Sequence, residues 1–209
     1  MSILTEISEL MQQGKIPMVK EKVKEAIDAG IEVKSILEEG LLSGMSVIGE
    51  KFKNNQIFVP QVLIAARAMS VGVDVLKPYL TEAGVESKGT AIIGSVKGDL
   101  HDIGKNLVKI MLEGKGIKVI DLGTDVAPDA FIDAAIEHNA KIICCSALLT
   151  TTMGEMKAIV DTAVARGVRD KFKIMIGGAP VTKEFCDSIG ADCYTSDAAS
   201  ASDAAISFF

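Results

Sequence analysis

The feature that most constrains this chain is a change of hydrophobic period near residue 89. Along residues 1–80, apolar side chains recur at helical spacing throughout. Beyond residue 89, short apolar runs alternate with amphipathic stretches long enough for helices. Such alternation is typical of a parallel sheet that helices cover on both faces. The chain is therefore predicted to join a helical bundle to an α/β unit.

The predicted elements of the second part make five strand–helix units. Strands are expected at 90–93, 118–121, 141–145, 173–176 and 193–194, and helices at 103–115, 127–138, 153–166, 181–189 and 197–208. The fold class is α plus α/β: an N-terminal helical bundle, then a Rossmann-like (flavodoxin-like) doubly wound parallel sheet of five strands. The segment Thr81–Gly89 has two glycines and little periodicity. The predicted domains are 1–82 and 90–209, joined by a linker at 83–89.

Charge and cysteine content exclude several function classes. Lys plus Arg number 22 against 28 Asp plus Glu, a net charge of −6, and no basic cluster stands out. Nucleic acid is therefore not an expected partner. The four cysteines lack CxxC spacing, and residues 1–15 lack the pattern of a signal peptide. We expect reduced thiols, no membrane association and a cytoplasmic location.

The loop after the first predicted strand contains the most unusual residues. In a doubly wound sheet, ligands bind beyond the carboxyl ends of the strands. The loop 94–104 places His101, one of two histidines, between Asp99 and Asp102. A neutral imidazole is a good metal ligand, and a carboxylate on its other nitrogen fixes the tautomer. Asp99 and His101 are a candidate pair; the alternative is that an aspartate only caps the next helix.

Two further strand-end loops carry hydroxyls and small residues. Residues 146–152 read Ser-Ala-Leu-Leu-Thr-Thr-Thr, and residues 177–180 read Gly-Gly-Ala-Pro. Glycines allow a ligand to approach the backbone, and hydroxyls both donate and accept hydrogen bonds. Ordinary turn chemistry is the alternative for each loop taken alone. The Gly-x-Gly-x-x-Gly pattern of dinucleotide-binding loops is absent from the loop 94–104, as is a Walker-type phosphate loop.

These three loops together resemble a known family, the cobalamin-binding domains in which a protein histidine replaces the cofactor's own benzimidazole on cobalt. The family signature is Asp-x-His-x-x-Gly, then Ser-x-Leu, then Gly-Gly. Here it reads Asp99, His101 and Gly104, then Ser146 and Leu148, then the pair 177–178. The N-terminal helices are similar to the cap of methionine synthase and of the corrinoid proteins in anaerobic methyltransferase systems. The resemblance covers nearly the whole chain.

The resemblance implies roles for individual residues. His101 would be the lower axial ligand of cobalt, Asp99 would hold its other nitrogen, and Thr152 would complete the relay at a position where methionine synthase has serine. The other residues implied to bind the cofactor in the second domain are Gly98, Leu100, Asp102, Gly104, Ser146, Leu148, Thr150, Gly177, Gly178 and Ala198. From the cap, Phe58, Leu63 and Met69 would form an apolar wall over the methyl face. Bundle core is the alternative for these three.

The function implied by the resemblance is that of a methyl carrier. Its cofactor would be cobalamin, alternating between methylcobalamin and cob(I)alamin. One partner would be a substrate-specific methyltransferase, and a second methyltransferase would pass the methyl group to a thiol or tetrahydrofolate acceptor. A reductive activation protein is a third implied partner. The chain has no room for a substrate barrel and is not expected to turn over alone.

Two other functions suit a cobalamin-binding chain. A cobalamin-dependent sensor or regulator can share the cap and the sheet, but it usually needs an output module, and none is visible in the sequence. A subunit of a radical mutase is disfavoured, because such enzymes need a substrate barrel. The sequence does not identify the methyl donor: methylamines, methanol, quaternary amines and methoxylated aromatics remain open.

Overall fold

The computed structural model describes residues 2–82 and 87–209. The pattern of contacts divides the chain into two compact units, Met1–Ser87 with Gly114–Gly116, and Lys88–Glu113 with Ile117–Phe209. Of the linker predicted at 83–89, residues 83–86 lie outside the described residues. Each unit is described below by itself.

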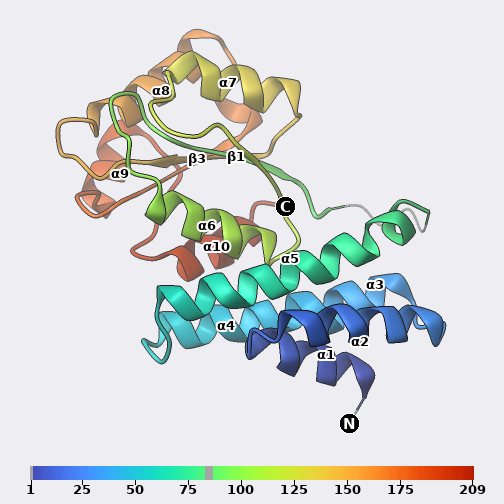
Figure 1. The fold of residues 1–209 in the computed structure, drawn as a ribbon. Helices are drawn as coiled ribbons and strands as arrows, with labels where there is room; N and C mark the ends of the chain where they lie inside the picture. Colours follow the sequence, from blue (N-terminus) through green and yellow to red (C-terminus); the bar gives the residue numbers. More distant parts are fainter. Residues whose placement is uncertain (1, 83–86) are drawn as a thin grey trace. The chain divides into compact units, whose positions relative to one another are not determined.

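The first unit is a bundle of helices, as the apolar spacing predicts (Figure 1). Its elements are α1 (Ile3–Gln12), α2 (Ile16–Asp28), α3 (Val33–Ser35), the π-helical η1 (Ile36–Leu42), α4 (Ser43–Lys53) and α5 (Val59–Glu82). Ser2 caps α1 by accepting a hydrogen bond from the backbone N–H of Thr5. Prolines stand in the first turns of α2 and α5, where a missing N–H costs little. The core includes Ile7, Met11, Val23, Leu41, Met45, Val62 and Leu76.

The π-helical segment was not predicted. α3, η1 and α4 follow one another without a break from Val33 to Lys53, and η1 widens the middle of this helix. Apolar spacing does not distinguish a π turn from an α turn over one or two turns, so the sequence signal is continuous here. Gly44 lets this helix approach α1, because a Cβ there would lie 2.4 Å from Cε of Met11.

The helix α5 is the longest helix that the structure describes. By length and composition its segment Val59–Leu80 could also cross a membrane, with a mean hydropathy of 1.5. Core helices pass the same test, so this is weak evidence for a span. Val62, Ala65 and Leu76 are fully buried, and α5 packs against α2 and α4.

The second unit is built on one parallel sheet of five strands, which confirms the predicted fold class. The strands are β1 (Thr90–Ser95), β2 (Lys118–Asp121), β3 (Ile142–Ser146), β4 (Lys173–Gly177) and β5 (Cys193–Tyr194), in the order β2-β1-β3-β4-β5. Every neighbouring pair is parallel. The helical elements are α6 (Ile103–Glu113), α7 (Pro128–Glu137), α8 (Gly154–Ala165), a 3-10 turn η2 (Arg169–Lys171), α9 (Lys183–Ile189) and α10 (Ala198–Ile206).

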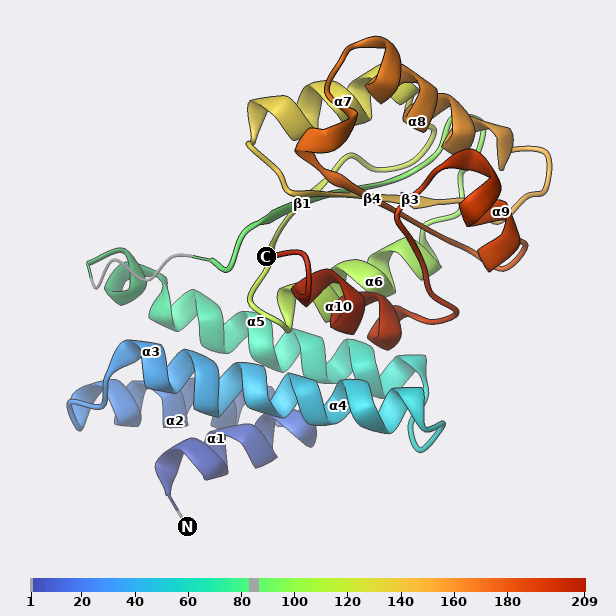
Figure 2. The same cartoon turned by 180° about the vertical axis from the view of Figure 1, so that it is seen from behind.

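Helices cover both faces of this sheet (Figures 1 and 2). α7 and α8 lie on one face, and α6 and α10 lie on the other. Each face has its own apolar cluster: Phe131, Ile143 and Ile159 belong to the first, and Ile93 and Leu112 to the second. The strands are apolar on both sides because both sides are covered.

The strand order fixes where a ligand loop can lie. β1 pairs with β2 on one side and with β3 on the other, so the chain changes direction across the sheet between β1 and β3. At such a switch point the loops that follow the two strands separate and leave room at the carboxyl edge. The loops predicted to carry the site follow β1, β3 and β4.

Candidate functional site

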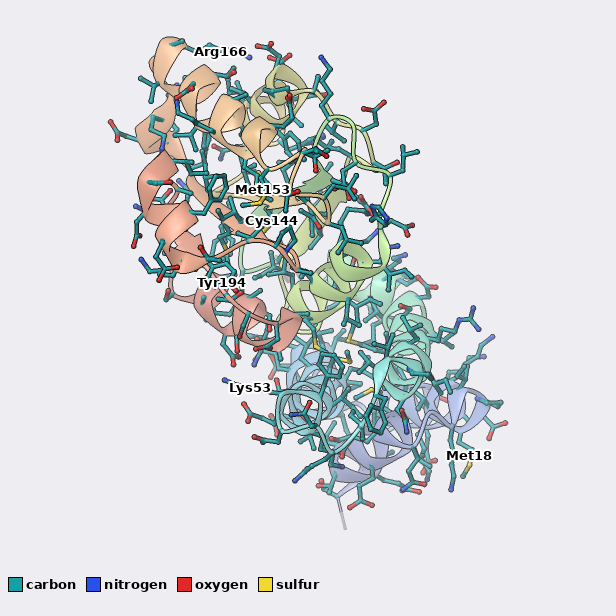
Figure 3. All side chains as sticks on the ribbon, turned by 90° about the vertical axis from the view of Figure 1, so that its left-hand side faces the viewer. Met18, Lys53, Cys144, Met153, Arg166 and Tyr194 are labelled. Carbon is teal, nitrogen blue, oxygen red and sulfur yellow. The ribbon has the colours of Figure 1, made fainter. Side chains whose placement is uncertain are left out.

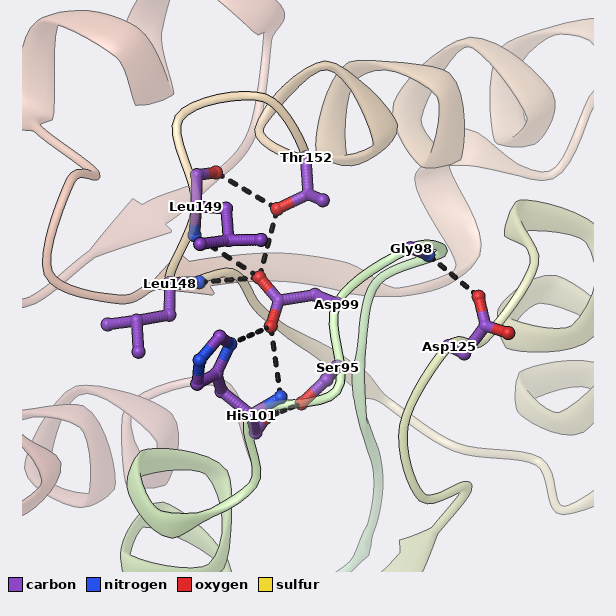
Figure 4. A network of polar contacts seen from close by, with 8 residues as sticks. All are labelled: Ser95, Gly98, Asp99, His101, Asp125, Leu148, Leu149 and Thr152. Carbon is purple, nitrogen blue, oxygen red and sulfur yellow. Dashed lines mark hydrogen bonds and ion pairs between the residues drawn. The ribbon is translucent and has the colours of Figure 1, made fainter.

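A fully buried carboxylate organises the loops at this edge. Asp99 is 0% exposed. Its Oδ1 accepts hydrogen bonds from the backbone N–H and the Nδ1 of His101, at 3.0 and 2.8 Å. Its Oδ2 accepts from the N–H groups of Leu148 and Leu149, at 2.7 and 3.3 Å. Both oxygens are therefore used, one by the loop after β1 and the other by the loop after β3 (Figure 4).

Thr152 adds a fifth donor. Its Oγ1 lies 2.9 Å from Oδ2 of Asp99 and 2.9 Å from the carbonyl oxygen of Leu149. Both neighbours are acceptors, so the single hydroxyl hydrogen is donated to one of them at a time. The chain of contacts His101–Asp99–Thr152 joins the loop after β1 to the turn before α8.

The hydrogen bonds determine the charge of Asp99. Burial by itself raises the pKa of a carboxyl group. Here the donors from Leu148, His101 and Thr152 outweigh that effect and hold the pKa of Asp99 well below its usual range. Asp99 is therefore an anion at neutral pH. The alternative that Asp99 only caps the next helix is wrong, because its partners lie in loops and at Thr152 rather than in the first turn of α6.

The imidazole of His101 is held at Nδ1, and among the described residues no hydrogen bond to Nε2 is found. An ionised carboxylate only accepts hydrogen bonds, so the Nδ1 facing it carries a hydrogen; in the neutral ring this places the lone pair on Nε2. The side chain of His101 is 51% exposed. A single oriented nitrogen donor of this kind suits a metal whose other ligands belong to a prosthetic group.

The three motif loops meet at one edge of the sheet. The N–H of Val96 donates to the carbonyl of Ser146, and the N–H of Ala147 donates to the carbonyl of Gly177. The loop after β3 is thus bonded to the loops on either side. These contacts confirm the prediction that the three strand-end loops lie together.

The two glycines of the third motif differ in their surroundings. Gly178 has a φ of +134°, and a Cβ there would lie 1.8 Å from the carbonyl oxygen of Ala147. Glycine is therefore required at 178 by the fold itself. At Gly177, apart from the adjoining residues of the chain, no atom lies within 4 Å of the position that a Cβ would take. Gly177 leaves open space beside the loop, which a ligand can enter.

Exposed apolar side chains lie close to His101 in the chain and on the loop that is hydrogen-bonded to Asp99. Leu100, Ile103, Leu148 and Leu149 are all exposed. Four exposed large apolar residues on two adjacent loops and the first turn of α6 are typical of a ligand-binding rim. This rim suits a broad apolar ring system.

The remaining predicted residues fall into three groups. Asp102 and Gly104 are exposed at the start of α6, and Asp102 accepts a hydrogen bond from Nδ2 of Asn106 at 3.1 Å. Thr150 is exposed in the turn before α8, and Ala198 is buried at the first turn of α10. The cap residues Phe58, Leu63 and Met69 belong to the first unit: Phe58 and Leu63 are 66% and 42% exposed, whereas Met69 is buried.

Two residues at this edge escaped the sequence analysis. Ser95, fully buried at the end of β1, donates its hydroxyl to the carbonyl of His101. Asp125, in the turn after β2, accepts a hydrogen bond from the N–H of Gly98 at 2.7 Å. A polar residue ending an apolar strand is a usable signal for Ser95. No local pattern marks Asp125, because its partner lies 27 residues away.

Other reactive side chains lie away from this chemistry. Burial raises the pKa of Cys144 to about 12 and that of Cys145 further above its usual value. Both thiols are unreactive at neutral pH and pack in the sheet, as Figure 3 shows for Cys144. His138 is exposed at the end of α7. Arg166, which is labelled in Figure 3, follows the C-terminal end of α8. It forms ion pairs with Asp129 and Asp133.

Comparison with known proteins identifies the family. Two family models, each described as a B12 binding domain, match residues 89–205 and 3–77. The chain belongs to the B12-binding corrinoid proteins. It is 44% identical over 179 residues to trimethylamine corrinoid protein 1 of Methanosarcina acetivorans, covering 85% of this chain and 83% of the relative. A corrinoid protein of Desulfitobacterium hafniense is 39% identical over 195 residues, covering 92% and 90%.

A solved structure shares the whole fold. The methanol:cobalamin methyltransferase complex MtaBC from Methanosarcina barkeri aligns with a TM-score of 0.88 at 30% identity, over 99% of this chain and 80% of that chain. The resemblance drawn from the three motifs is confirmed at the level of the family. This protein is a cobalamin-binding corrinoid protein of the kind found in methyltransferase systems.

Proposed function

We propose that this corrinoid protein carries methyl groups on a cobalamin whose cobalt is ligated by Nε2 of His101. The observation that carries the proposal is the 2.8 Å hydrogen bond between Nδ1 of His101 and the buried Asp99. It leaves Nε2 available for a ligand bond, in a side chain that is 51% exposed. When bound, the cofactor supplies a cobalt centre able to accept a methyl group and to release it.

The chain's own residues bind and orient that cofactor. Asp99 keeps the imidazole in one tautomer, and Thr152 helps to keep Asp99 ionised. Ser146, Leu148, Gly177 and Gly178 would line the slot for the displaced nucleotide tail, and Ala198 would lie near its far end. Gly98, Leu100, Asp102, Gly104 and Thr150 would border the corrin, and Phe58, Leu63 and Met69 would form the apolar wall.

The partners follow from the proposed role. We infer a substrate-specific methyltransferase that loads the carrier and a second methyltransferase that unloads it to a thiol or tetrahydrofolate acceptor. A reductive activation protein would restore cobalt that has become oxidised. The relatives support the first of these partners, since one is named for trimethylamine and another is part of a methyltransferase complex. Four free cysteines suit the reducing cytoplasm, where we place this function.

Electron paramagnetic resonance tests the ligation directly. The chain has two histidines, so a His138→Gln variant grown with nitrogen-labelled histidine carries the label only at His101. Loaded with cob(II)alamin, this variant should show coupling to one labelled nitrogen. His101→Ala should lose that coupling. Coupling to the cofactor's own benzimidazole, unchanged by His101→Ala, would contradict the proposed ligation.

A second assay distinguishes a carrier from a sensor. The carrier should pass a methyl group from a methylated donor to an acceptor only when both methyltransferases are added to the loaded protein. A regulator would instead bind DNA in a gel-shift assay without needing them. Trimethylamine, dimethylamine, monomethylamine and methanol, each with its own methyltransferase, are the donors to compare.

A further inference from the structure

The loop that carries Asp99 and His101 is also held from its outer side, by a residue outside the three motifs. Asp125 lies in the turn after β2 with a φ of +56°, in the left-handed region. L-residues seldom adopt this conformation, although Asp and Asn tolerate it better than most. A conformation of this kind persists where surrounding contacts require it.

Asp125 makes two contacts with consecutive residues of the ligand loop. The N–H of Gly98 donates to its Oδ1 at 2.7 Å, and its own N–H donates to the carbonyl of Asp99 at 3.0 Å. Figure 4 shows Asp125 on the far side of the loop from Leu148 and Thr152. The segment 98–99 is thus fixed from both sides.

The backbone of this segment needs such support. Gly98 has a φ of +79°, and the N–H of Asp99 closes a tight turn by donating to the carbonyl of Val96. Glycine has the largest conformational freedom to lose, so this turn gains most from a fixed partner. The direction of the Asp99 carboxylate depends on the turn that precedes it.

We propose that Asp125 is a positioning residue, which holds the turn at Gly98 so that Asp99 meets His101 before any cofactor binds. The contact between Asp125 and the loop does not depend on the proposed function. Only its effect on cobalt ligation rests on that function. Pre-organisation of this kind lowers the ordering cost that a ligand must otherwise meet on binding.

Two substitutions of Asp125 separate the effect of its carboxylate from the effect of its backbone conformation. Asp125→Gly keeps the positive φ without strain and removes the acceptor. Asp125→Asn keeps an oxygen acceptor and tolerates the same φ. Both variants retain the N–H that donates to Asp99, so both should fold.

The first measurement is amide hydrogen exchange in the full chain without cofactor. In Asp125→Gly, exchange at the N–H groups of Gly98 and His101 should be about tenfold faster, the factor that one lost hydrogen bond represents. In Asp125→Asn it should stay within about twofold of wild type. The N–H of Ile143, in the centre of the sheet, should not change in either variant. Unchanged exchange at His101, or equal acceleration at Ile143, would overturn the proposal.

The second measurement uses cob(II)alamin as the probe. In Asp125→Gly, the fraction of cobalt that shows coupling to the His101 nitrogen should fall, and Asp125→Asn should restore it. Full coupling in Asp125→Gly would overturn the positioning role. If wild type shows no such coupling, the proposed function is contradicted instead. The exchange measurement would then still test whether Asp125 holds the turn at Gly98.

Discussion

At the scale of single residues, the charge of Asp99 is the central property of the site. Five donors converge on its two oxygens, and a protonated carboxyl cannot satisfy all of them. Because the folded pKa is depressed, the contribution of Asp99 to stability is present above the unfolded pKa of about 3.9 and is lost as the pH falls below it. Neutral and mildly acidic solutions should therefore leave this contribution intact.

Asp99→Asn tests that argument in the cofactor-free chain. At neutral pH the variant should lose about 2 kcal/mol of unfolding free energy, because an amide cannot accept from all of the converging N–H groups. The difference from wild type should shrink as the pH falls below about 4. Urea unfolding across a pH series measures it, with the exposed Asp102→Asn as the matched control. A difference that stays constant down to pH of about 2.5 would contradict the depressed pKa.

Sequence reasoning predicted part of this network and missed part of it. Asp99, His101 and Thr152 follow the ends of neighbouring strands, and the rule that ligand loops meet at the carboxyl edge predicts that such residues converge. Ser95 and Asp125 act through backbone groups of the ligand loop. The polar residue at the end of an apolar strand is a signal for Ser95, whereas nothing in the residue types pairs Asp125 with Gly98, which lies 27 residues earlier in the chain.

At the scale of elements, the predicted strands lie within two residues of the observed ones, because each is a short apolar run bounded by polar residues. The core of the bundle follows from helical spacing in the same way. The π turn at Ile36–Leu42 and the 3-10 turn at Arg169–Lys171 were missed. Both depend on local hydrogen bonding and on neighbouring packing, which hydrophobic periodicity does not report.

At the end of β4, the adjacent glycines Gly177 and Gly178 allow a prediction at the scale of elements. Gly178→Ala should strongly destabilise the cofactor-free chain, because the new Cβ would clash with the backbone of Ala147 at a positive φ. Gly177→Ala should leave the unfolding free energy within about 1 kcal/mol of wild type. If the nucleotide tail lies beside it, Gly177→Ala should still weaken cobalamin binding about tenfold or more, through the lost space.

Thermal unfolding without cofactor and titration with cobalamin separate the two effects. Gly154→Ala, also free of neighbours within 4 Å, is the matched control for Gly177→Ala. Undiminished cobalamin affinity in Gly177→Ala would show that the tail lies elsewhere.

At the scale of the whole molecule, the chain has two compact units, each with an apolar core. A ligand that binds a folded unit stabilises it, by about 2.7 kcal/mol at a hundredfold excess over the dissociation constant. If cobalamin contacts only the sheet unit, it should stabilise that unit and leave the stability of the helical unit unchanged. If Phe58 and Leu63 also contact it, the helical unit should gain as well.

Native-state hydrogen exchange followed by mass spectrometry can report on each unit separately. Peptides from α2 and from β4 represent the two cores, because each element contributes fully buried apolar residues. Cobalamin should increase protection in both peptides of the wild-type chain. In a Phe58→Ala, Leu63→Ala double variant, the gain should persist in β4 and disappear in α2.

The choice of side chains makes this comparison interpretable. Phe58 and Leu63 are exposed, so their replacement should change the stability of the bundle by no more than about 0.5 kcal/mol. Met69 is buried, and Met69→Ala would cost about 2–5 kcal/mol whether or not it faces a cofactor. Met18→Ala, on an exposed face of α2, controls for the loss of apolar surface. If cobalamin still increases the exchange protection of α2 in the double variant, Phe58 and Leu63 are not the wall. The helical unit would then be coupled to cobalamin by other contacts.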